Sequence, residues 1–410
     1  MTDASQPRSA RGKMLPAGIL ATALIALLAF APLASATPDP VGGGSTTVTL
    51  KGNFVNYLKT FGIKVQKIGP AKLNGKKATF TNTGGSVDPT TGQGEVTLGG
   101  GLKFKAGKKT APVKALVLNT TKKALFAKVA GKKMKFATVA GWSQARNGFG
   151  VNITVKKLKL TGSAASALNK KTGYQKGKPK PFLANKLMAQ AKSDVQPSTV
   201  AVLPGGNATL ALSAQAVEKL SKVGPEVAPG FWPFEVKLAT VAPTTVTVPG
   251  PPPTVAFPIS GGTMGPSATS GVLQTIGGLT LSQNLEALGP NGNGQTTLTL
   301  GNIWVDMGTK QASVEVSVTS TATNEETKKA ANLGNLGRAS IADLVIGPVT
   351  IDSATRTISV TNATATLQAV TAETLNSVFI KPIEKEAGPD DVQFAAGDPL
   401  GTFSFTAQTQ

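Results

Sequence analysis

The sequence of 410 residues contains no cysteine, no histidine and only two tyrosines. Without cysteine there is no disulfide, thiolate nucleophile, iron–sulfur cluster or cysteine-ligated zinc. Without histidine there is no Ser-His-Asp triad, no imidazole metal ligand and no side chain that ordinarily titrates near neutral pH. The remaining enzyme chemistries rest chiefly on paired carboxylates or a Ser–Lys nucleophile. We therefore expect a binding or structural protein and not an enzyme.

The N-terminus has the pattern of an export signal. A basic segment, residues 8–13, precedes an uncharged apolar stretch at 15–33, and the small residues Ala-Ser-Ala follow at 34–36. This order is typical of a secretory signal peptide with its cleavage site, although the stretch is also nearly long enough for a membrane anchor. We expect residues 1–36 to be the signal peptide and residues 37–44 to be a flexible N-terminal tail. The mature chain would then have no transmembrane anchor and would be secreted or cell-wall associated.

The chain also matches itself. Segments 84–102 and 261–279 align without gaps at an offset of 177 residues, with seven identities, five of them glycine. Weaker parallels lie on both sides, among them SAASALN at 163–169 and VTAETLN at 370–376. The offset grows along the chain because the second half has longer polar loops, which cost little to lengthen. We expect two divergent copies of one unit.

Short runs such as ATFTN, GLKFKAG and GVNITVKKLKL alternate apolar with polar residues, which is typical of half-buried strands. Each unit reads as a strand, a helix, further strands and a closing helix. The sequence therefore predicts a mainly β protein of two tandem β-sandwich or open-barrel domains, each with one or two short helices. We expect the first domain at 45–174, a basic linker at 175–200 and the second domain at 201–410.

The two halves differ in charge. Residues 37–200 contain 29 Lys and Arg against 4 Asp and Glu, whereas residues 201–410 contain 10 against 16. Lysines at alternate strand positions form either a solvated face that discourages edge pairing or an anion-binding surface. As its partner we expect anionic cell-wall polymer and not nucleic acid, because the basic half has one arginine and no aromatic stacking platform. A contact between the two oppositely charged domains is a further alternative.

Three stretches carry a resemblance to a known family: Phe54-Val55-Asn56-Tyr57, the segment GGSVDPTTGQGEVTLGGGLKF at 84–104, and the strand pair after it. With the order of elements above, they resemble the HtaA-type (haem-transport-associated) domain of secreted or surface-attached actinobacterial proteins, a module often found in tandem. The resemblance spans most of 45–175 and, more weakly, 205–380. It implies the capture of haem and its passage to an importer.

In that family an early tyrosine is the axial haem ligand and a histidine after the glycine-rich strand assists it. The resemblance implies Tyr57 as the ligand, and a phenolate oxygen is a hard donor that suits iron(III). The helper histidine has no counterpart at 104–107, and the second half has Lys219 near the tyrosine's place. The alternative for Tyr57 is structural, because it shares helical spacing with Phe54, Leu58 and Phe61.

Candidate contacts for haem propionates or other anions are Lys103, Lys105, Lys108 and Lys109. We expect no catalytic residue and no protein metal site. The leading hypothesis is an exported, non-catalytic binding protein of the cell envelope, and the first alternative is haem binding through Tyr57. A second alternative is a carboxylate-based glycan hydrolase, which would need two acids facing each other across a cleft.

Overall fold

The computed structural model describes residues 38–175, 177–223, 236–284, 294–321, 332–379 and 393–410. The expected signal peptide, 1–36, lies outside these residues. Within the described part of the chain, no helix combines the length and the apolar composition needed to cross a membrane. The chain forms two separate antiparallel sheets, each with its own helices, so the expectation of a mainly β protein with two barrel-like domains is confirmed.

The first domain contains a ten-stranded sheet and two helices. In chain order its elements are β1 (Asp39–Leu50), α1 (Gly52–Thr60), β2 (Ile63–Ile68), β3 (Lys72–Asn74), β4 (Lys77–Val87), β5 (Gly94–Ala106), β6 (Lys109–Asn119), β7 (Ala124–Val129), β8 (Lys132–Asn147), β9 (Gly150–Leu160), α2 (Gly162–Thr172) and β10 (Leu187–Pro197).

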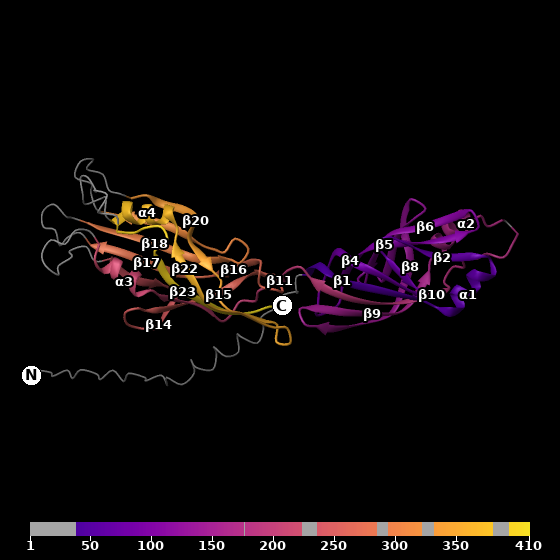
Figure 1. The fold of residues 1–410 in the computed structure, drawn as a ribbon, viewed down its shortest axis with the longest axis horizontal. Coiled ribbons are helices and arrows are strands. Elements are labelled where there is room, and N and C mark those ends of the chain that lie inside the picture. Colours follow the sequence, from indigo (N-terminus) through magenta and orange to yellow (C-terminus); the bar gives the residue numbers. More distant parts are fainter. Residues whose placement is uncertain (1–37, 176, 224–235, 285–293, 322–331, 380–392) are drawn as a thin grey trace, which may run out of the picture. The chain divides into compact units, whose positions relative to one another are not determined.

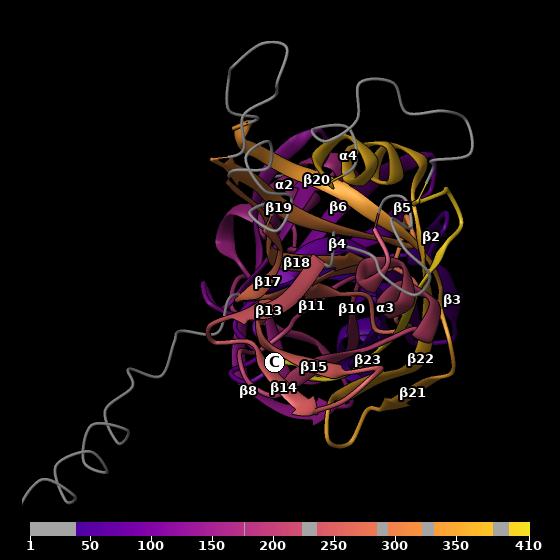
Figure 2. The same ribbon diagram turned by 90° about the vertical axis from the view of Figure 1, so that its left-hand side faces the viewer.

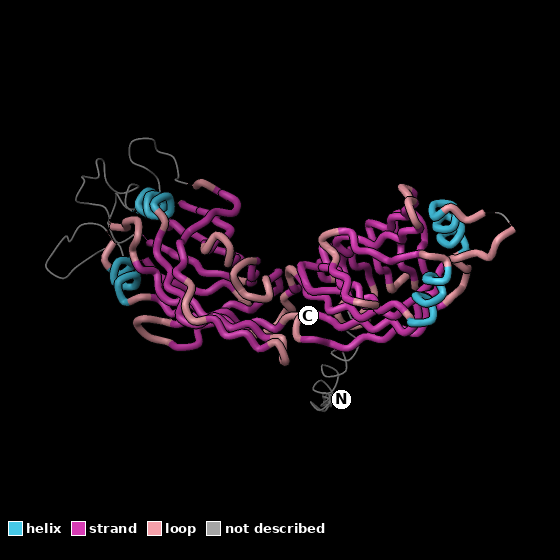
Figure 3. Tube along the Cα trace, turned by 45° about the vertical axis from the view of Figure 1, so that its right-hand side comes forward, coloured by secondary structure: helices cyan, strands magenta, loops and turns pink. Residues whose placement is uncertain are grey.

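The strand order of this sheet is β2-β5-β6-β7-β8-β9-β10-β1-β4-β3, and β5 also pairs with β4. That extra pairing closes β5 through β10, β1 and β4 into a ring, which removes the open sheet edges of those strands. Its interior holds large aromatic side chains that are almost inaccessible to solvent, namely Phe80, Phe104, Phe136 and Phe182. Helices α1 and α2 lie at the same end of the ring (Figures 1 and 3).

The second domain contains a thirteen-stranded sheet and, among the described residues, two helices. Its elements are β11 (Val200–Ala201), β12 (Asn207–Leu212), α3 (Ala214–Ser221), β13 (Val236–Val241), β14 (Thr245–Val248), β15 (Thr254–Met264), β16 (Gly271–Thr275), β17 (Gly278–Asn284), β18 (Gln295–Asp306), β19 (Gln311–Ser320), β20 (Gly334–Val345), β21 (Val349–Asp352), β22 (Thr357–Leu367), α4 (Ala369–Phe379) and β23 (Pro399–Gln408).

Here the main path is β11-β15-β12-β23-β22-β20-β19-β18-β17-β13, and β16 pairs with both β15 and β18. The strand β16 therefore closes a second ring, running from β15 through β12, β23, β22, β20 and β19 to β18. Figure 2 views this domain from the end that carries α3 and α4. The side chains inside this ring are mostly aliphatic, with Leu and Val on β17, β18 and β19.

Two expected loop segments are strands. Residues 39–44, expected in a flexible tail, begin β1, where Val41 is buried and Gly44 pairs with Val195. Residues 187–197, expected in a basic linker, form β10 between β1 and β9, without which the first ring would stay open. The residues before β10 are rich in Lys and Pro, so the expected linker is too long and includes this strand. Its buried side chains include the small Ala189 and Ala191. In both domains a strand follows the closing helix.

The glycine-rich segments place glycine where the backbone requires it. Gly100 has φ +85°, and a Cβ there would lie 2.6 Å from the backbone nitrogen of Ala71. Gly277, at the equivalent position of the second segment, has φ +84°, and its Cβ would lie 2.9 Å from the backbone nitrogen of Thr244. Only glycine fits such a left-handed position against another backbone.

Candidate functional site

The end of the first domain that carries α1 and α2 brings together most of the residues singled out in the sequence. Helix α1 buries Phe54 and Leu58, four residues apart, on one face. Helix α2 begins at Thr161, whose hydroxyl accepts a hydrogen bond from the Ala164 amide, and ends at the left-handed Gly173. The segment that follows α2 returns past α1 toward β10.

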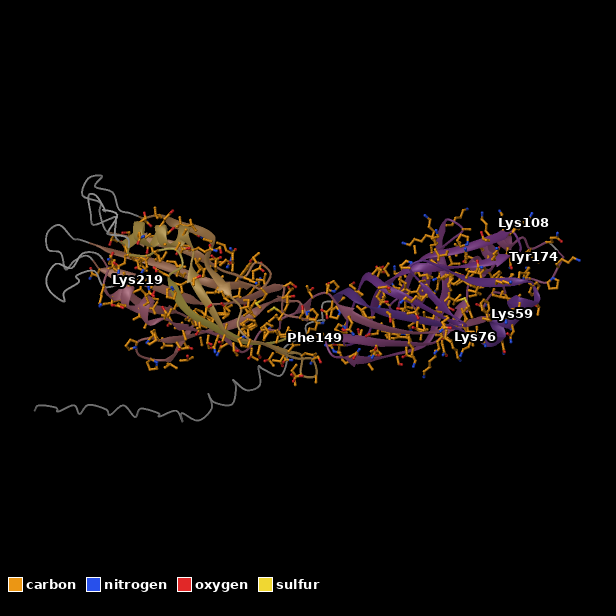
Figure 4. The ribbon with its side chains drawn as sticks, in the orientation of Figure 1. Lys59, Lys76, Lys108, Phe149, Tyr174 and Lys219 are labelled. Carbon is orange, nitrogen blue, oxygen red and sulfur yellow. The ribbon has the colours of Figure 1, made fainter. Side chains whose placement is uncertain are left out.

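An open pocket of about 360 Å³ lies between these elements. We call it the helix-end pocket, and its lining includes Phe61, Ile63, Ala106, Tyr174, Pro179 and Pro181. The wall therefore combines the residue after α1, the paired ends of β2 and β5, and the segment after α2. Figure 4 labels Tyr174, Lys108 and Lys59 at this end of the domain.

Tyr57 lies behind one wall of this pocket. Its side chain is half-buried, and its hydroxyl donates a hydrogen bond of 3.0 Å to the backbone carbonyl of Lys180, between the lining residues Pro179 and Pro181. Its ring meets the ring of Phe61 edge-on at a centroid distance of 5.1 Å. Tyr57 thus has the packing contact that the structural alternative requires.

Tyr174 is a residue of this pocket that no sequence pattern indicates. This residue follows the helix-ending Gly173, is half-buried and lines the helix-end pocket directly. Its backbone amide donates to the carbonyl of Asn169, which completes the end of α2. The available signal was its rarity, since the chain has only two tyrosines.

The four candidate lysines lie along β5 and the turn that follows it. Lys105, Lys108 and Lys109 are exposed beside the lining residue Ala106, whereas Lys103 is half-buried farther along β5. Lys109 extends toward the end of α2, because a Cβ on Gly173 would lie 2.6 Å from the Lys109 Nζ. Of the four candidates, Lys109 therefore lies beside the lining residue Gly173, but none of the four lines the pocket, and the lysine in its lining is Lys178.

The lysines of the first domain have no acidic partners in the described residues. The three ion pairs in the described part of the chain all belong to the second domain. The carboxylates of the first domain hold local structure instead: Asp88 accepts from Thr90 and Thr91 in its turn, and Asp194 accepts from Gln196. An uncompensated lysine surface favours anions of low geometric demand, because an ammonium group acts as a point charge.

The donors at this end suit an iron porphyrin better than a metal ion bound by the protein alone. Among the described residues there is no group of three or more carboxylates that could hold a metal ion. The lining of the helix-end pocket does include the phenol of Tyr174, apolar side chains and the ammonium group of Lys178. These features fit a planar apolar group with carboxylate substituents and a hard iron.

The first helix of the second domain has a lysine at the position that Tyr57 takes in α1. Tyr57 lies six residues after Lys51, the residue that precedes α1, and Lys219 lies six residues after Ser213, which caps α3. The Lys219 Nζ is 2.6 Å from the Asp398 Oδ2. An ion-paired lysine does not supply the phenol oxygen found in the first domain.

No protein-family model matches the sequence, and no curated protein is similar to it. The solved structures to which the chain is similar include the haem-binding protein HtaB of Corynebacterium glutamicum, at 13% identity and a TM-score of 0.33, over 52% of this chain and 96% of that one. They also include the C-terminal domain of HtaA from the same organism, at 13% identity and a TM-score of 0.32, over 52% of this chain and 99% of that one.

Proposed function

We propose that this chain is an exported, non-catalytic binding protein of the cell envelope whose first domain binds haem at the helix-end pocket. The observation that carries the proposal is that the Tyr57 hydroxyl bonds to the Lys180 carbonyl, between two prolines that line the helix-end pocket, while Tyr174 lines the pocket itself. The sequence resemblance to HtaA-type domains points to the same end of the domain. Haem would supply an iron(III) centre that takes a phenolate oxygen.

Different residues would contact different parts of such a ligand. Phe61, Ile63 and the two prolines provide apolar contact for the flat face. Lys105, Lys108 and Lys109 provide ammonium groups for the propionates. Tyr57 is the proposed iron ligand, and it would have to leave the Lys180 carbonyl, because a phenolate cannot donate that hydrogen bond.

The test is a haemin titration of the mature chain, residues 37–410, followed in the Soret region beside Tyr57→Phe and Tyr174→Phe. Each substitution keeps the ring and removes only the oxygen, so the two variants are matched controls for each other. We expect a saturable one-to-one transition that Tyr57→Phe abolishes and Tyr174→Phe retains. The reverse pattern would assign the ligand to Tyr174, and a transition unchanged in both variants would rule out a phenolate ligand.

A second candidate function is contact with anionic cell-wall polymer. The specific observation in its favour is that the described lysines of the first domain form no ion pairs with carboxylates. Retention of the protein on isolated cell walls should then weaken steeply as salt is raised. The variant Lys105→Gln/Lys108→Gln/Lys109→Gln should elute at lower salt than the parent, and salt-insensitive retention would contradict this role.

We also infer that the two domains are divergent copies of one unit. The Asn169 side chain donates to the carbonyl of Phe182 and accepts from its amide, and Asn376 makes the same two bonds with Phe394. Both asparagines are the eighth residue of their helix, and both phenylalanines precede the last strand of their domain. This arrangement supports the duplication expected from the sequence.

A further inference from the structure

The second domain encloses a cavity of about 200 Å³, whereas the interior of the first domain leaves only about 20 Å³. We call it the second-domain cavity. Its wall is formed chiefly by Leu279, Leu281, Leu298, Leu300, Val314 and Val316 on β17, β18 and β19. Protein interiors rarely contain voids larger than a water molecule. A void of this size in an otherwise regular ring therefore indicates a binding site for a ligand.

Two replacements contribute to the difference between the domains. Phe104, which packs edge-on against Phe182 at 5.2 Å in the first domain, corresponds at the constant offset of 177 to Leu281. The carbonyl of Phe136 accepts a hydrogen bond from Thr161, just before α2, and the carbonyl of Ile341 accepts the same bond from Gln368, just before α4. Both Leu281 and Ile341 line the second-domain cavity. Smaller side chains at these two positions leave the space that phenylalanine fills in the first domain.

Helix α3 gives independent evidence that the described residues do not fill this space. Its first-domain counterpart α1 buries Phe54 and Leu58 against the core. In contrast, α3 has no buried residue, although Ala216 and Leu220 lie on the side that lines the cavity. The apolar side of α3 thus faces the void instead of packed side chains.

The polar groups of the lining come from one side. These groups belong to Gln215 and Lys219 on α3, Thr371 and Thr374 on α4, Ser340 on β20 beside Thr371, and Asp398 before β23. The exposed lining residue Val370, with 60% of its surface accessible, marks an opening to solvent beside α4. An apolar interior with a few polar groups at one side is the usual design of a small-molecule site.

We propose that the second-domain cavity binds the aliphatic chain of a fatty acid, with the carboxylate held at Lys219. A cavity of about 150 Å³ lined by similar side chains already admits benzene, so this one accepts a length of hydrocarbon chain. The Lys219 ammonium has three N–H donors, and one of them donates to Asp398. Donors therefore remain for the carboxylate of a ligand.

The walls do not suit haem, the ligand assigned to the first domain. No tyrosine, histidine or cysteine is present in residues 201–410, so those axial donors are missing from the second domain. Among the lining residues Phe394 is the only aromatic one, and the remaining apolar wall is aliphatic. The site therefore suits an aliphatic chain that carries a carboxylate, and not an iron porphyrin.

The test is a titration of the mature chain with cis-parinaric acid, a fatty acid whose fluorescence rises in apolar surroundings. We expect saturable one-to-one binding that palmitic acid displaces. The paired substitution Leu281→Phe/Ile341→Phe, which restores the first-domain side chains, should weaken binding about ten-fold or more. The control Val246→Phe adds the same bulk on the exposed strand β14 and should leave binding unchanged.

A second variant keeps the proposal testable if the filled protein does not fold. Lys219→Gln leaves the cavity intact, so it should weaken displacement by palmitic acid about ten-fold and leave displacement by the corresponding alcohol unchanged. Equal loss for acid and alcohol would overturn the assignment of the carboxylate. The proposal as a whole fails if cis-parinaric acid shows no saturable binding. It also fails if a folded Leu281→Phe/Ile341→Phe protein binds as tightly as the parent, or if haemin alone fills the cavity.

Discussion

Asp39 illustrates how a single residue departs from its ordinary chemistry. Its side chain is only 6% exposed on β1, and its Oδ2 atom has no hydrogen-bond partner in the described residues. Burial raises the pKa of this carboxyl to about 7, and the Arg146 guanidinium opposes part of that rise. A chain without histidine nevertheless contains a group that titrates near neutral pH.

The raised pKa makes the stability of the first domain depend on pH. Because the folded-state pKa lies above the ordinary value of 3.8, the folded protein binds this proton more tightly than the unfolded chain. Its contribution is fully present below pH 3.8 and is lost as pH rises to about 7. We expect Asp39→Asn to raise the free energy of unfolding by about 1–2 kcal/mol at pH 8, but to have little effect at pH 4. Denaturant titrations at the two pH values measure this, and an equal effect at both would contradict the assignment.

Asn169 holds the segment after α2 against the core through two buried hydrogen bonds to Phe182, of 2.8 and 3.0 Å. Asn169→Ala leaves the amide and the carbonyl of Phe182 without their partner, so we expect a loss of about 2–3 kcal/mol in the free energy of unfolding. Asn376→Ala is the matched variant in the second domain, where the bonds are only partly buried. It should cost less, and a larger loss there would count against burial as the cause.

At the scale of elements, two glycines in and just after the glycine-rich strand β5 differ in how closely other backbone atoms approach them. At Gly100 a methyl group would meet the backbone of Ala71 and Ile68 within 2.7 Å, whereas at Gly107 it would meet nothing within 4 Å. Both positions have positive φ, so they share the conformational cost and differ in the clash. Gly100→Ala should lower the free energy of unfolding by about 3 kcal/mol and Gly107→Ala by about 1 kcal/mol. Similar losses for the two variants in urea titrations would argue against the close approach.

Elements with a strong local pattern could be predicted from the sequence. The helix around Tyr57 and the alternating strands follow from apolar spacing, and the glycines at 84–102 and 261–279 share the same turn geometry. The strands at 39–44 and 187–197 could not be predicted, because their place depends on ring closure by distant partners. The lysine-rich residues before β10 look like a linker when only the sequence is available.

At the scale of the whole molecule, the sequence predicts two β domains of opposite charge but not which residues meet in space. The sequence pattern indicates Tyr57 and the lysines at 103–109 but not Tyr174, which reaches the helix-end pocket only through the path taken after α2. The second-domain cavity was equally hidden, since Leu281 and Ile341 are ordinary core residues until they are compared with Phe104 and Phe136. A position that lacks a large side chain leaves no recognisable pattern in the sequence.

The hollow interior of the second domain has a mechanical consequence. Hydrostatic pressure favours the state of smaller volume, and unfolding removes internal voids. Two rings of the same construction should therefore respond differently, because one holds about 200 Å³ of void and the other about 20 Å³. In high-pressure NMR of residues 37–410, the resonances of the second domain should shift first, and this domain should unfold at a lower pressure than the first domain. Palmitic acid in the cavity should bring its pressure tolerance toward that of the aromatic-filled first domain.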